Sequence, residues 1–148
     1  MDDLVAWLRE QIAEKRRRAM RTQWTAGGPP AAWTYSRERF RVTTLDPSGN
    51  TQGVASRRTG VGTDGQPYDD VLLDVDGEHM ELNDPRSAVA ECDAHDEIIN
   101  KYEGALFTLQ AHPEDVANNG YVLGASAAVV ALALAYQHRP GYREEWRP

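Results

Sequence analysis

The stretch that decides the fold is residues 83–109, which read NDPRSAVAECDAHDEIINKYEGALFTL. Asp84 is a residue type preferred at helix N-caps, and Pro85 suits the first helical position, where its missing N–H would have no partner. Steps of four and three residues then alternate along one series of positions: Ala88, Cys92, His95, Ile99, Tyr102, Leu106 and Leu109. This heptad spacing predicts a long helix that packs lengthwise against another helix and ends near His112-Pro113.

A further helix is predicted downstream, from about Tyr121 to Gln137, after a break in the chain at Asn118-Asn119-Gly120. It is apolar on more than one side, with Val122 and Val129 on one flank and Leu123 on another. Such a helix is typically buried on several faces, either at the centre of the domain or in a subunit contact. Its uncharged stretch is shorter than the roughly 20 residues of a membrane span, so we expect no membrane helix.

Upstream, residues 3–21 are predicted to form a helix, because one apolar series recurs at helical spacing: Leu4, Val5, Leu8 and Ile12. The acidic residues of this segment come early and the basic residues late, which suits the helix dipole. The apolar stripe fades after Ile12. We therefore expect the second half of the helix to project from the core.

Between the helices, short strand-like segments and turns follow a break rich in Gly and Pro at residues 27–30. The strongest hairpin prediction pairs Val71–Val75 with Glu78–Leu82, because Asp76-Gly77 between them is a favoured two-residue turn. The sequence therefore predicts an α+β fold. It consists of an N-terminal helix, a small antiparallel sheet of about three to four strands and two long antiparallel C-terminal helices.

The length of 148 residues, 41% hydrophobic and 26% charged, is typical of a single globular domain. We divide it into a helix with a basic end at residues 1–24, a β-hairpin region at 33–82, a helical pair at 84–138 and an aromatic tail at 139–148. Cys92 is the only cysteine, so no internal disulfide can form. Because the chain also begins without a signal-like apolar run, we expect a cytoplasmic protein.

The net charge of −7 is unevenly distributed along the chain. Residues 1–60 hold 11 Lys and Arg against 6 Asp and Glu, whereas residues 61–148 hold 5 against 17. Such a division indicates that the two halves face each other or that one half has an electrostatic partner, and the alternative is a solvated surface with unevenly distributed charges.

Candidate partner-binding residues lie at two places. The main basic cluster ends the first predicted helix and consists of Lys15, Arg16, Arg17, Arg18 and Arg21. We predict that it pairs with an acidic surface, in another protein or in another copy of the chain, whereas nucleic acid is not expected to bind a chain that is acidic overall. The exposed tail adds two aromatic candidates, Tyr142 and Trp146.

The best metal-like cluster lies on the long helix: Glu91, Cys92, His95 and Asp96. A metal site needs three or four converging ligands, and no second helix supplies matching residues, so we predict neither a metal site nor catalytic residues. Residues 60–65 match the glycine pattern of dinucleotide-binding loops, but Gln66-Pro67 follows in place of a helix. We therefore predict that the protein has no cofactor.

Four segments near the two ends carry a resemblance: residues 1–8, MDDLVAWL; 83–85, NDP; 132–136, LALAY; and above all the tail 140–146, PGYREEW. In these segments the chain resembles a family of small uncharacterised proteins from actinobacteria and their phages. The resemblance implies a bacterial cytoplasm or, for a phage protein, the cytoplasm of the host. It implies no catalytic residues, because the family has no assigned activity.

These features lead to one functional hypothesis and two alternatives. We expect a non-enzymatic, protein-binding accessory or regulatory module. The first alternative is a self-assembling structural subunit, for example of a virion, in which the basic helix end of one copy meets the acidic face of the next. The second is a small hydrolase whose site the sequence patterns do not reveal.

Overall fold

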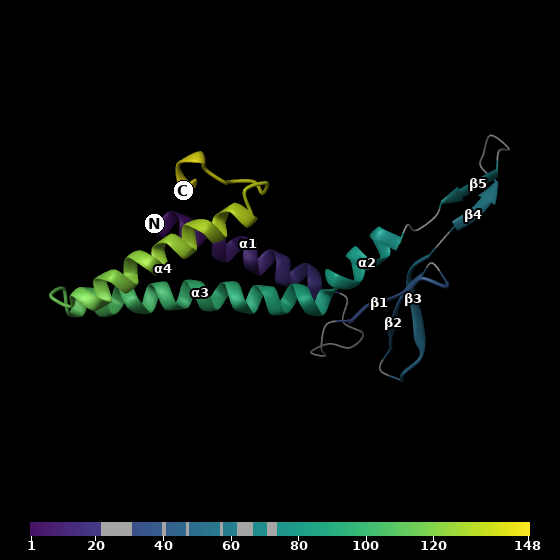
Figure 1. The fold of residues 1–148 in the computed structure, drawn as a ribbon, viewed down its shortest axis with the longest axis horizontal. Helices are drawn as coiled ribbons and strands as arrows, with labels where there is room; N and C mark the ends of the chain where they lie inside the picture. Colours follow the sequence, from purple (N-terminus) through teal and green to yellow (C-terminus); the bar gives the residue numbers. More distant parts are fainter. Residues whose placement is uncertain (22–30, 40, 47, 57, 62–66, 71–73) are drawn as a thin grey trace. The chain divides into compact units, whose positions relative to one another are not determined.

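The computed structural model describes residues 1–21, 31–39, 41–46, 48–56, 58–61, 67–70 and 74–148. The chain forms two compact units, one made of residues 1–16 and 90–148 and the other of residues 17–89. The first unit is helical, and the second contains all the described strands (Figure 1). Helices and strands are segregated along the chain, so the predicted α+β fold class is confirmed.

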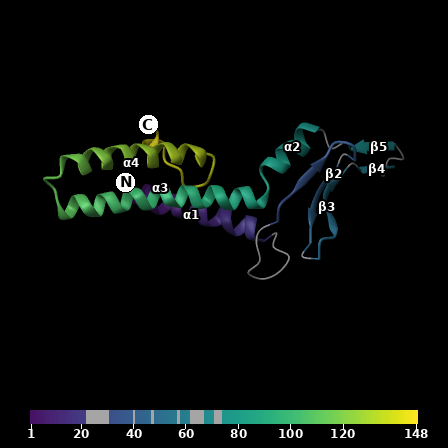
Figure 2. The same ribbon diagram turned by 60° about the horizontal axis from the view of Figure 1, so that its bottom comes forward.

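Three helices build the first unit: α1 (Asp2–Met20), α3 (Pro85–Ala111) and α4 (Val116–Ala135). The boundary between the units falls within α1 and within α3. After a connection at residues 112–115, α4 returns antiparallel along α3, and α1 lies along α3 as well (Figures 1 and 2). A single 3-10 turn, η1 (Glu144–Trp146), lies in the C-terminal tail. The predicted bounds of the first helix and the predicted end of the long helix are confirmed.

One apolar stripe from each helix forms the core of this unit. The side chains that are at most 1% exposed there are Leu4, Leu8, Ile12, Cys92, Ile99, Val129 and Ala133. The heptad series predicted on α3 faces this core from Cys92 onwards, with Leu106 and Leu109 packed against it, whereas Ala88 belongs to the other unit. Each fully buried Leu or Ile side chain contributes roughly 1.5–3 kcal/mol to the stability of the fold.

The start of α4 corrects a sequence prediction. Asn118-Asn119-Gly120 does not break the chain but lies inside the helix, which begins at Val116. Asp115 caps the helix, because its carboxylate accepts a 3.0 Å hydrogen bond from the backbone N–H of Asn118. The amide of Asn118 also donates to the backbone carbonyl of Ala105 on α3, at 3.1 Å. These two contacts outweigh the weak helix propensity of the segment.

A three-stranded antiparallel sheet with the order β1-β2-β3 occupies the second unit. Its strands are β1 (Thr34–Ser36), β2 (Arg41–Leu45) and β3 (Thr51–Ser56). The β2–β3 turn is closed by Asp46, whose carboxylate accepts hydrogen bonds from the N–H groups of Ser48 and Asn50, while Gly49 adopts φ 82°. These contacts hold the pKa of Asp46 below its usual range, the Asn50 backbone bond being the largest cause. A separate pair of antiparallel strands consists of β4 (Arg58–Val61) and β5 (Pro67–Asp70).

The hairpin predicted at residues 71–82 is wrong, because Asp74–Leu82 forms a helix, α2. The last described strand ends at Asp70, and residues 71–73 of the predicted hairpin lie outside the described residues. Gly77 lies buried inside α2, and a Cβ atom at this position would overlap the ring of Tyr35 on β1. The glycine thus permits close packing of α2 on the sheet and does not form a turn. The predicted break at 27–30 and residues 62–66 of the predicted glycine loop lie outside the described residues.

The predicted start of α3 is confirmed in atomic detail. Asp84 is buried, and its carboxylate accepts a 2.6 Å hydrogen bond from the backbone N–H of Ser87, as an N-cap residue does. Its second oxygen accepts from the backbone N–H of Trp33, at 3.2 Å. The cap of α3 thereby also orders the chain just before β1.

Candidate functional site

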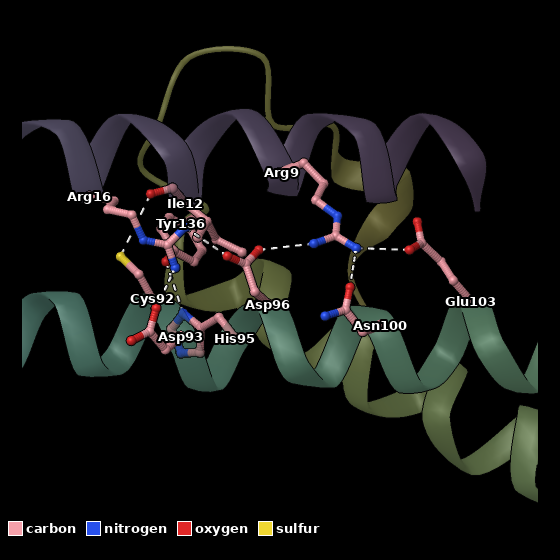
Figure 3. A network of polar contacts seen from close by, with 10 residues as sticks. All are labelled: Arg9, Ile12, Arg16, Cys92, Asp93, His95, Asp96, Asn100, Glu103 and Tyr136. Atoms are coloured by element: carbon pink, nitrogen blue, oxygen red, sulfur yellow. Dashed lines mark hydrogen bonds and ion pairs between the residues drawn. The ribbon is translucent and has the colours of Figure 1, made fainter.

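A charged seam joins α1 and α3 within the helical unit (Figure 3). The guanidinium of Arg9 donates hydrogen bonds to Asp96 at 3.1 Å, to Asn100 at 2.7 Å and to Glu103 at 2.8 Å. One arginine of α1 thus binds side chains on three successive turns of α3. These contacts set the two helices antiparallel and fix their register.

The basic end of α1 continues the same seam. Arg16 pairs with Asp93 at 2.7 Å and with the second oxygen of Asp96 at 2.9 Å, and Lys15 pairs with Glu91 at 2.5 Å. Burial lowers the pKa of Arg16, but the hydrogen bonds and negative charges of Asp96 and Asp93 outweigh it and raise the pKa. The sequence-level alternative in which oppositely charged parts of the chain face each other therefore holds for Lys15 and Arg16.

The remaining residues of the predicted basic cluster lie in the other unit. Arg17, Arg18 and Arg21 are exposed, and Arg17 and Arg18 take part in interactions of their own. Their role in binding a partner stays a prediction. The sequence reasoning missed Arg9, although a signal exists: Arg9 and Arg16 are seven residues apart, as are Asp96 and Glu103.

A polar contact is buried where α3 meets α4 (Figure 3). Nδ1 of His95 lies 2.9 Å from the hydroxyl of Tyr136, and the two rings meet edge to face. Burial lowers the pKa of His95, and it raises the pKa of Tyr136 to about 12. Both side chains are therefore neutral at physiological pH, and their hydrogen bond satisfies two polar groups inside the core.

The thiol of Cys92 lies on the same helix but is not arranged for nucleophilic chemistry. Its Sγ is fully buried and donates to the backbone carbonyl of Ile12 on α1, at 3.6 Å. Burial raises the pKa of Cys92, whereas a reactive cysteine needs a lowered one. The thiol acts here as a small core group.

The four residues of the metal-like cluster contact different partners, although Nε2 of His95 also lies 3.8 Å from a carboxylate oxygen of Glu91. Glu91 pairs with Lys15, and Asp96 lies between the two arginines of the seam. His95 and Cys92 point to partners in the core. Among the described residues, no three His, Cys, Asp or Glu side chains are grouped so as to hold a metal ion.

The aromatic tail packs on its own helical unit, which corrects the expectation that it is exposed. The indole N–H of Trp7 on α1 donates to the carbonyl of Pro140 at 3.0 Å, and its ring lies 5.8 Å from Tyr142 and 5.2 Å from Trp146. Gly141 has φ 85°, and a Cβ there would come within 3.0 Å of the Trp7 indole nitrogen. Tyr142 and Trp146 are half-buried, and their role in binding a partner stays a prediction.

The tail is also held by charge. Arg143 pairs with Asp3 at 3.1 Å, and its guanidinium carbon lies 5.2 Å from the centre of the Trp146 ring. Trp7 was not singled out from the sequence. Its position on the apolar side of the N-terminal helix, next to Leu8, was the available signal.

The outer face of α4 is the largest unexplained apolar feature of the unit. One flank of α4 is buried as predicted, through Val122, Val129 and Leu132. The alternative in which the helix lies at the centre of the domain is wrong, because Leu123 is 68% exposed and Tyr121 is 52% exposed, and the alternative of a subunit contact stays a prediction. We define the outer face of α4 by its exposed residues Val116, Gly120, Tyr121, Leu123, Gly124 and Ala128.

An apolar groove of about 380 Å³ runs beside this face, between α4 and α3. Its α3 wall is formed by Ile98 and Lys101, and its α4 wall by Gly120, Tyr121, Gly124, Ala125 and Ala128. A Cβ atom at Gly120 or Gly124 would meet no other atom within 4 Å. The groove has the dimensions and lining that suit an apolar side chain or a helix edge.

The length of α4 also corrects the expectation that it is too short to span a membrane. With 20 residues, α4 is the one described helix that is long and apolar enough to cross a bilayer by length and composition. Only 17% of its most apolar window is buried within the chain. A helix in a protein contact can have the same length and composition, so the absence of a membrane helix stays a prediction.

The whole chain, residues 1–148, matches a family of unknown function (DUF6221), and the protein belongs to that family. No curated protein and no solved structure matches the chain.

Proposed function

We propose that this member of the family is a non-enzymatic protein-binding module with an accessory or regulatory role, and that the outer face of α4 is its binding surface. The observation that carries the proposal is the exposure of this face: only 17% of the most apolar window of α4 is buried. Soluble monomers rarely leave a continuous apolar helix face in water, and such a face marks an interaction site.

The contacts within the unit support this use of α4. The inner flank of the helix is anchored in the core by Val129 and Ala133, both 0% exposed. The charged seam holds α1 on α3, so that α3 presents Ile98 and Lys101 beside α4. A groove on a rigid helical support binds a helix of a partner at low entropic cost.

The hydrolase alternative has less support. A cysteine hydrolase needs a thiol with a lowered pKa or a neighbouring base, whereas the pKa of Cys92 is raised and its thiol contacts a backbone carbonyl. We place the proposed role in the cytoplasm of an actinobacterium or of the host of an actinophage, as the tail residues 140–146 suggest.

Site-specific photo-crosslinking in cells tests the binding surface. A photoreactive residue replaces Leu123 in one variant and Leu45 in another, because both leucines are more than 60% exposed but Leu45 lies on β2, in the other unit. The proposal expects a discrete crosslinked product from position 123 and not from position 45. Equal or absent products at the two positions would contradict it.

A further inference from the structure

We propose that the occupant of the outer face of α4 is a second copy of this chain, bound with the two α4 helices antiparallel. This inference rests on the proposed function and names its partner. Helix α4 carries no charged side chain, since no Asp, Glu, Lys or Arg occurs from Val116 to Tyr136. Two copies of an acidic protein with a net charge of −7 can therefore approach each other without like charges on the two α4 helices, and Lys101 of α3, which lines the adjacent groove, pairs with Glu97 at 3.5 Å.

The charges that flank α4 indicate the direction of the second copy. Glu114 and Asp115 directly precede the helix, with His112 lying 3.6 Å from Glu114, whereas Arg139 follows the helix. In an antiparallel pair, the acidic end of one helix meets the basic end of the other. In a parallel pair, like charges would meet at both ends, and the helix dipoles would also be aligned unfavourably.

The two exposed glycines of α4 fit the same contact. Glycine costs about 1 kcal/mol relative to alanine inside a helix, and among the described residues no side chain lies within 4 Å of a Cβ placed at Gly120 or Gly124. The groove beside them has Ile98 on its opposite wall and Tyr121 at its side. A second α4 that enters this space would cover the apolar side chains of both copies symmetrically.

A lipid bilayer is a less suitable occupant. Insertion of α4 would remove Val122, Val129 and Leu132 from the core and separate Tyr136 from His95. The acidic chain would also be repelled by anionic lipid. One helix face of 20 residues is about 30 Å long and about 10 Å wide, which is small for a protein contact, so we expect a dimer that dissociates at micromolar concentration.

Sedimentation equilibrium of the purified full chain tests the inference. The mass of the wild type should rise from 16.5 kDa towards that of a dimer across the micromolar range. Ala128→Lys should weaken the association by at least about tenfold, because a lysine would enter the contact. Ala6→Lys is the matched control, an exposed alanine on α1, and should associate as the wild type does.

Disulfide crosslinking tests the direction. The exposed residues Glu114 and His138 are replaced singly by cysteine, with the buried Cys92 left in place. An antiparallel pair predicts a disulfide when the Glu114→Cys and His138→Cys variants are mixed and none in either variant alone. Disulfides within each variant alone would overturn the antiparallel arrangement.

Three results would overturn the second copy as the occupant: a wild type that stays at 16.5 kDa, an Ala128→Lys variant that associates normally, or binding of the chain to neutral phosphatidylcholine vesicles in place of dimer formation. The proposed function is tested by a different outcome from the one that tests the second copy. If the chain is monomeric but a different protein crosslinks at position 123, the binding surface stands and only its assigned occupant is wrong.

Discussion

Helices α1 and α4 both lie along α3, but they bind it by different means. Between α1 and α3, ion pairs from Arg9, Lys15 and Arg16 run beside the apolar stripe. Between α4 and α3, the contact is apolar apart from the Tyr136–His95 and Asn118–Ala105 hydrogen bonds, as far as the described residues show.

The difference shows how each helix uses its side chains. The apolar stripe of α1 and the charges of Arg9, Lys15 and Arg16 are largely satisfied within the chain, and Trp7 binds the tail. On α4, one flank completes the core while the outer face has no counterpart among the described residues. The contacts show that α1 stabilises the unit, and the outer face of α4 is the surface that we propose for a partner.

The largest expected effect comes from a charge placed on the buried side of α3. Ile99→Asp should unfold the helical unit, because Ile99 is 0% exposed and an unpaired buried carboxylate costs several kcal/mol, comparable with a total stability of about 5–15 kcal/mol. Phe107→Asp on the same helix is the matched control, since Phe107 is 75% exposed. Circular dichroism melting curves measure both. A wild-type melting temperature for Ile99→Asp would show that the assigned core is wrong.

The next effect compares an aromatic residue on each helix. Trp7→Ala should lose about 3–5 kcal/mol and release the tail, because Trp7 contacts Pro140, Tyr142 and Trp146. Tyr121→Ala on the outer face of α4 should change the stability of the monomer by less than about 1 kcal/mol. Urea unfolding gives the free energies, and limited proteolysis reports the tail. Equal losses in the two variants would remove the distinction between α1 and α4.

A smaller effect is expected in the charged seam. Asp96→Ala removes one partner from both Arg9 and Arg16, and partly exposed pairs contribute about 0.2–1 kcal/mol each, so the loss should be about 1 kcal/mol. The loss should shrink in 1 M salt, where charges are screened. Glu97→Ala, which breaks only the exposed pair with Lys101 on the same helix, should cost a few tenths of a kcal/mol. Urea titrations measure the free energy of unfolding of both variants. The same loss in the two variants would show that the charged seam contributes no more stability than an exposed ion pair.

The smallest expected effect is a pH dependence from His95. Because burial lowers the pKa of this side chain in the folded protein, the unfolded chain takes up the proton first as the pH falls below about 6.5. Stability should therefore be full above this pH and fall between pH 7 and pH 5. In His95→Gln the decrease should be smaller, as measured by urea midpoints at both pH values. If His95→Gln lost as much stability between pH 7 and pH 5 as the wild type, groups other than His95 would cause the pH dependence.

Local signals in the sequence predicted the long helices well. The Asp84-Pro85 start and the heptad series describe α3 from end to end, because both depend on neighbours within the same segment. The two errors in predicted secondary structure occur where a tertiary contact determines the local conformation. Asn118 is held in α4 by the carbonyl of Ala105, and Gly77 lies in α2 against Tyr35. Neither contact can be derived from local pattern alone.

The candidate site was predicted only in part. The basic cluster at the end of α1 and the acidic residues of α3 were identified by composition, but their pairing requires the antiparallel register that Arg9 and Arg16 show. The packing of the tail on Trp7 depends on residues more than 130 positions apart in the chain. The exposure of Leu123 depends on which flank of α4 meets the core. The sequence therefore identified several residues of the site, but their arrangement depends on contacts between residues that are distant in the chain.

The central claim is that the chain associates through the apolar outer face of α4 and not through its basic cluster, and salt dependence tests this most directly. Sedimentation of the wild type at 0.1 M and 1 M salt compares Debye lengths of about 10 Å and about 3 Å. The account predicts dimers whose affinity is retained at 1 M salt, because apolar burial is not screened. Dimers that dissociate at 1 M salt, as a contact through Arg17, Arg18 and Arg21 requires, would contradict it.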